Sequence, residues 1–84
     1  MATYRVDVRV MPRAGLLDPQ GQAVEHALEA LGFGGVAAVR VGKALSVQVE
    51  ASDAASAERQ ARAMCERLLA NPVTEDFTLS VEAA

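Results

Sequence analysis

The chain has 84 residues, a formal net charge of −3, one cysteine and one histidine. This length suits one small domain, residues 1–84, whose core alone leaves it marginally stable. One cysteine excludes an internal disulfide, and the lack of a Cys/His cluster excludes a structural zinc, so partner association is the expected source of further stability. The acidic balance argues against nucleic acid or an anionic membrane as a partner. Without a membrane-length apolar run or a signal-peptide pattern, the sequence predicts a cytoplasmic protein.

The first half of the chain predicts a strand followed by a helix. Residues 4–10 (YRVDVRV) alternate apolar and polar side chains, as in a strand with one buried face. Asp18 and Pro19 are typical of a helix cap and a first helical position, and Gly32 of the helix end. The apolar stripe of this expected helix, residues 19–32, is formed by Ala23, Val24, Ala27, Leu28 and Leu31.

The second half predicts two strands, a helix and a last strand. Residues 36–41 and 44–50 both alternate, and the short Gly42-Lys43 connection between them predicts a hairpin. Ser52 or Asp53 caps a second helix that ends near residue 71. Its expected buried stripe is formed by Ala54, Ala57, Ala61, Met64, Cys65 and Leu68. With a strand at 77–82, the order β-α-β-β-α-β predicts a ferredoxin-like α+β two-layer sandwich, an antiparallel sheet with two helices on one face.

Gly21 is the one residue that does not suit the start of the first helix. A glycine within a helix costs about 0.5–1 kcal/mol relative to alanine. Either the backbone there takes a conformation that only glycine allows, or another surface approaches too closely for a Cβ. We expect the second cause, with a partner subunit or another copy of this chain as the surface. Gly21→Ala should then leave thermal stability unchanged or slightly raised but weaken complex formation.

The sequence offers no catalytic constellation. Cys65 lies on the apolar stripe of the second helix, where a cysteine usually behaves as a small hydrophobic residue. His26 faces away from the expected core, so it is either solvated or in contact with a partner chain. No metal site is expected, and the outward positions of the sheet lack the aromatic side chains that RNA-binding sheets use.

Three motifs resemble the PurS family, the small subunit of phosphoribosylformylglycinamidine (FGAM) synthase. They are LDPQGQAVEHALEALGF from residue 17, VRVGK from residue 39 and MCERLLANPVTEDF from residue 64. They occur in the right order and spacing, and the match runs from the first expected strand to the last, which is nearly the whole chain. Thr74, Phe77 and an alanine-rich second helix depart from the family pattern in packing only.

The resemblance implies a subunit without an active site of its own. The complex makes FGAM in purine biosynthesis from the formylglycinamide ribonucleotide, with ATP and glutamine. A glutaminase subunit, PurQ, releases ammonia, and a synthetase subunit, PurL, binds ATP and magnesium. PurS is then a homodimer or tetramer that bridges PurL and PurQ and supports ammonia transfer, with no cofactor of its own.

The expected interface combines the start of the first helix with the VRVGK motif. It consists of Leu17, Asp18, Pro19, Gln20, Gly21, His26, Arg40, Gly42 and Lys43. An alternative from another class is an ACT-like regulatory module, which binds a small ligand such as an amino acid. Its pocket would lie between the first strand and the first helix, near residues 12–21.

Overall fold

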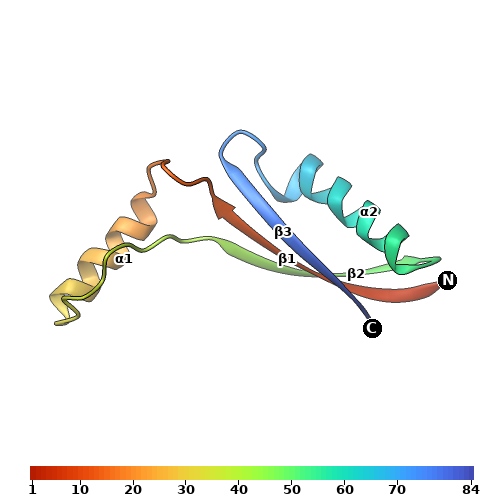
Figure 1. Cartoon of the computed structure of the whole chain (residues 1–84), viewed down its shortest axis with the longest axis horizontal. Helices are drawn as coiled ribbons and strands as arrows, with labels where there is room; N and C mark the ends of the chain where they lie inside the picture. The colour runs from red at the N-terminus through yellow and green to blue at the C-terminus, as the bar shows by residue number, and fades with distance from the viewer.

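A computed structural model describes all of residues 1–84 (Figure 1). Its elements in chain order are β1 (Ala2–Pro12), α1 (Pro19–Ala30), β2 (Lys43–Ala51), α2 (Ala54–Met64), η1 (Cys65–Leu69) and β3 (Glu75–Ala83). The three strands form one antiparallel sheet in the order β2-β1-β3. The expected α+β class, with a ferredoxin-like antiparallel sheet and two helices, is confirmed.

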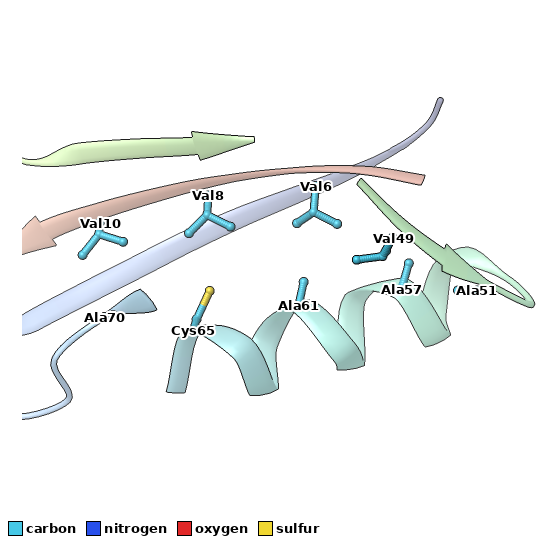
Figure 2. Packing of buried hydrophobic residues seen from close by; sticks show 9 residues of the cluster. All are labelled: Val6, Val8, Val10, Val49, Ala51, Ala57, Ala61, Cys65 and Ala70. Carbon is cyan, nitrogen blue, oxygen red and sulfur yellow. The ribbon is translucent and has the colours of Figure 1, made fainter. Parts of the chain in front are cut away.

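The core lies between α2 and one face of the sheet (Figure 2). Val6 and Val10 of β1 are fully buried, and Ala57 and Ala61 of α2 point toward the sheet. Because the side chains of α2 at this contact are small, the helix backbone packs close to the valines. The buried cluster consists of Val6, Val8, Val10, Val49, Ala51, Ala57, Ala61, Cys65 and Ala70.

The end of the second helix departs from the expected pattern because α2 continues into η1, a turn of π-helix. The backbone N–H of Ala70 donates to the carbonyl of Cys65 at 3.0 Å, a span of five residues. The wider turn rotates the following side chains relative to an α-helix. Leu68, expected in the buried stripe, is therefore 81% exposed, whereas Ala70 is buried.

The strand expected at 36–41 is not formed, and neither is the hairpin at Gly42-Lys43. The chain passes from this segment directly into β2 (Figure 1). A two-residue hairpin turn needs a positive φ at its first central residue, and Gly42 does not adopt one. Ala37 and Ala38 also give the segment little strand propensity.

As a result, α1 projects away from the sheet instead of lying beside α2 (Figure 1). Val24 and Leu31, from its expected buried stripe, are 41% and 74% exposed. The radius of gyration is 16.5 Å, whereas a compact chain of this length has about 12 Å. The expectation that both helices cover one sheet face within a single chain is therefore wrong for α1.

Candidate functional site

The start of α1 and the end of the extended segment meet at a junction held by the Asp18 carboxylate. One oxygen, Oδ1, accepts from the Gly21 N–H at 3.0 Å, which is the expected helix cap. The other, Oδ2, accepts from the Val41 N–H at 2.9 Å. Asp18 therefore caps α1 and also fastens it to residues 36–41.

The environment of Asp18 favours its charged form. The N–H groups of Gly21 and Val41 lower its pKa, and the positive charge of Arg40 adds to this effect. A lowered folded-state pKa contributes stability above the ordinary aspartate pKa. This contribution is lost as the pH falls through the lower pKa of the folded state, so the junction is expected to loosen in acid.

Gly21 is the only buried residue of α1. A Cβ at this position would overlap the carbonyl oxygen of Val39 and lie 2.6 Å from Oδ2 of Asp18. The close approach expected from the sequence is therefore present, but the approaching surface belongs to the same chain. The expectation that alanine is harmless to stability here is wrong, because backbone at 36–41 fills the space.

The second glycine of the predicted interface, Gly42, is also a packing residue. A Cβ there would overlap the Met11 sulfur and the Val10 carbonyl oxygen at the end of β1. Gly42 thus lets the extended segment cross the end of β1 before it enters β2. The sequence does not reveal Val39 as the neighbour of Gly21, or Val10 and Met11 as the neighbours of Gly42, because most of these contacts use backbone atoms and leave no signal in residue type.

Eight of the nine predicted interface residues gather at the junction. Leu17–Gly21 lie against the extended segment that holds Arg40, and Gly42 and Lys43 follow it into β2. His26 is exposed, as expected, but lies more than one helical turn further along α1. The side chains that the junction presents to solvent are Leu17, Pro19, Gln20, Arg40 and Lys43.

An open groove of about 800 Å³ adjoins the junction on the sheet face opposite α2. Arg9 and Arg40 line it beside the hydroxyl groups of Thr78 and Ser80. Neither arginine has an ion-pair partner, whereas Arg5 on the same face is paired with carboxylates. The groove therefore presents unpaired positive charge in an acidic protein.

A second groove, of about 550 Å³, lies where the ACT-like alternative places its ligand pocket. It runs between residues 14–18 and 38–40, with Gln22 and Glu25 of α1 on its wall. The carboxylate of Asp18 is also part of this wall, but both its oxygens already accept backbone hydrogen bonds. Of the two carboxylates on the wall, that of Glu25 is the one left to accept a hydrogen bond from the ammonium group of an amino-acid ligand.

Cys65, the strongest nucleophile in the chain, is fully buried against the sheet, as expected. Burial raises the pKa of its thiol, which keeps it protonated and unreactive. No three His, Cys, Asp or Glu side chains lie together in a way that would hold a metal ion. Neither α1 nor α2 has the length and apolar composition of a membrane span.

Cys65 is predicted to resist thiol reagents in the folded protein. An aromatic disulfide reagent should modify it at least tenfold more slowly in buffer than in denaturant, because the thiol is buried and protonated. An exposed control cysteine, introduced as Ser80→Cys in a Cys65→Ala background, should react at the same rate in both solutions. Equal rates for native Cys65 in buffer and denaturant would contradict its placement in the core.

Comparisons with known proteins agree with the fold and with the motifs. The family model "PurS: Phosphoribosylformylglycinamidine (FGAM) synthase" matches residues 5–83. The Bacillus subtilis protein "Phosphoribosylformylglycinamidine synthase subunit PurS" is 43% identical over 79 residues, which are 94% of this chain and 93% of that protein. Crystalline Thermus thermophilus PurS has a TM-score of 0.85 at 41% identity and 98% coverage of both chains.

A further solved structure, PurLQS from Thermotoga maritima, contains a chain that matches this one with a TM-score of 0.89. The identity is 29%, and the match covers 98% of this chain and 100% of that chain. A family match over nearly the whole length, with close relatives at 41–43% identity, establishes membership. The chain therefore belongs to the PurS family and is a subunit of phosphoribosylformylglycinamidine synthase.

Proposed function

We propose that this chain is the non-catalytic bridge between the synthetase subunit, PurL, and the glutaminase subunit, PurQ. The observation that carries the proposal is the match of almost the whole chain to one chain of the solved PurLQS assembly. The buried, protonated Cys65 agrees with a role that is not catalytic. ATP, magnesium and the ribonucleotide then bind to PurL, and the complex works in the cytoplasm.

A bridge helps this reaction because ammonia must pass between two active sites. Free ammonia in water near neutral pH is mostly ammonium, which has no lone pair with which to attack. Holding the glutaminase and synthetase sites together raises the local ammonia concentration and limits its escape. A docking subunit therefore increases glutamine-dependent synthesis without contacting a reacting atom.

The exposed side chains of the junction are the proposed docking surface for the larger subunits. Leu17 is 76% exposed and offers an apolar contact, while Arg40 is an exposed cation without an ion-pair partner. An apolar centre beside a charged side chain is the usual composition of a specific interface. Asp18, Gly21 and Gly42 hold the backbone in place beneath this surface.

Reconstitution of the enzyme tests the proposal. PurL and PurQ are assayed for FGAM formation with glutamine, and separately with a high concentration of ammonium salt, with and without this chain. We expect the chain to raise the glutamine-dependent rate at least tenfold and the ammonium-dependent rate by less than twofold. Equal glutamine-dependent rates with and without the chain would refute the bridging role.

A matched pair of variants tests the surface. Arg40→Glu reverses a charge at the junction, whereas Arg67→Glu makes the same change on η1, where the side chain is also exposed. We expect Arg40→Glu to raise the concentration of this chain needed for half-maximal glutamine-dependent activity about tenfold. Arg67→Glu should leave that concentration unchanged, and an equal effect of both variants would argue against docking at the junction.

A further inference from the structure

Arg9 stands on the sheet face opposite α2 with small side chains on both sides. In the strand register it lies opposite Ala44 of β2 and Thr78 of β3. Arg5, on the same face of the same strand, instead lies opposite Glu82 and forms an ion pair with it. The sheet therefore supplies a cross-strand carboxylate for Arg5 but none for Arg9, and the small neighbours of Arg9 leave the space beside it open.

Arg40, from the extended segment before β2, reaches the same space. The two arginines together line the groove of about 800 Å³ and also an adjoining hollow of about 180 Å³ beside Met11. Both arginine side chains are exposed, and neither has an ion-pair partner. Like charges that share one cavity repel each other, so an anion placed between the two guanidinium groups is attracted by both.

The carboxylates next to these two arginines are already engaged by other arginines. Asp7 lines the groove, and its Oδ2 lies 3.3 Å from Nε of Arg5. Asp76 lines the adjoining hollow, and its Oδ1 lies 3.2 Å from Nε of Arg13. The fold thus leaves the two arginines of the groove without a counter-charge from this chain.

The groove also offers hydroxyl donors and a size that suits a small ligand. Ser46, Thr78 and Ser80 line it from the two strands that flank β1. Strands that flank a common neighbour are about 10 Å apart, so donors on β2 and β3 can reach one ligand that lies over β1. A volume of about 800 Å³ falls within the usual range for small-molecule sites.

We propose that this groove, centred on Arg9 and Arg40, binds the phosphate groups of a small phosphorylated molecule. A phosphate group has oxygens on several sides, so it can accept hydrogen bonds from both guanidinium groups and from the Thr78 hydroxyl at once. A carboxylate has two oxygens in one plane, which suit one guanidinium group but not this whole set of donors. A phosphate ligand therefore fits the groove better than an acidic segment of a partner protein. The inference does not depend on the role between PurL and PurQ.

Calorimetric titration of the chain with inorganic diphosphate tests the site. The buffer contains little salt, because salt screens exposed charges, and no magnesium, because magnesium would bind the diphosphate. We expect saturable binding of diphosphate, and at least tenfold weaker binding of citrate, which carries a comparable charge on carboxylates. Equal affinities for the two anions would overturn the phosphate assignment in favour of an acidic protein segment. Absence of diphosphate binding would refute the site itself.

A matched pair of variants locates the bound anion. Arg9→Gln should weaken diphosphate binding at least tenfold, whereas Arg59→Gln, on α2, should leave it unchanged. Both side chains are exposed and without an ion-pair partner, so both variants should fold and both remove one positive charge. Equal losses of affinity would show only a general attraction of anions and would refute the groove.

Nuclear magnetic resonance gives a second measurement that needs no substitution. Diphosphate should shift the backbone amide signals of Arg9, Arg40 and Thr78 more than those of α2, because α2 lies on the other face of the sheet. Shifts that are largest on α2 would place the anion elsewhere and overturn the proposal.

Discussion

Gly21→Ala is expected to lower the free energy of unfolding by about 1–3 kcal/mol, the usual cost of forcing an extra group into a packed site. The new methyl group would meet the carbonyl oxygen of Val39, which is backbone and cannot rotate aside. The Asp18 carboxylate stands on the other side, held by its bonds to Gly21 and Val41. Either α1 or the extended segment must move, which would break the bond from Val41 to Asp18.

Urea denaturation measures the free energy of unfolding, and hydrogen exchange at the Val41 amide reports the loss of its bond to Asp18. Gly34→Ala is the matched control, because a Cβ there meets nothing within 4 Å and the glycine does not need a positive φ. The control should leave stability unchanged or slightly increased, since alanine restricts the unfolded chain. If Gly21→Ala behaves like this control, the contact with Val39 does not constrain the folded protein.

Ala61→Leu is expected to cost about 1–3 kcal/mol or more, for a different reason. Ala61 is 1% exposed and faces β1, where Val6 and Val10 are fully buried (Figure 2). Three extra carbon atoms would push α2 away from the sheet along the whole helix. Because a domain of this size has only about 5–15 kcal/mol of stability, the variant should melt well below the unmodified protein.

The matched control for this variant lies in the same helix. Ala63 is exposed, so Ala63→Leu adds the same atoms to α2 without entering the core. Leucine has nearly the helix propensity of alanine, and the control should change stability by less than about 0.5 kcal/mol. Similar melting temperatures for the two variants would show that α2 does not depend on small residues for its packing.

Both glycines of the junction come from motifs that carried the family resemblance. LDPQG contributes Asp18 and Gly21, and VRVGK contributes Val39, Val41 and Gly42. In the sequence these motifs are about twenty residues apart and look independent. In the structure the two segments pack against each other, so each one fixes the backbone position of the other.

The sequence determined the local features of this protein. The alternation of apolar residues located β1, β2 and β3, and their polar faces, because a strand turns successive side chains to opposite sides. Asp18 was identified as a helix cap from the local pattern, and Asp53 was one of two expected caps for the second helix. The buried Cys65 followed from the apolar spacing of its helix, and the three motifs pointed to the family.

Tertiary structure alone decided which surfaces meet. Alternation at 36–41 specifies an extended backbone but not the strand that pairs with it, and the short Gly42-Lys43 connection suits either a closed hairpin or a straight hinge. The π turn at Cys65–Leu69 changed which leucine is exposed, which no α-helical spacing anticipates. Gly21 was conspicuous in the sequence, but the reason for a glycine there is the carbonyl oxygen of Val39, eighteen residues further along the chain. Strand pairing and close backbone contacts join backbone groups that are distant in the chain. Because these groups are the same in nearly every residue type, the local order of side chains does not specify which of them meet.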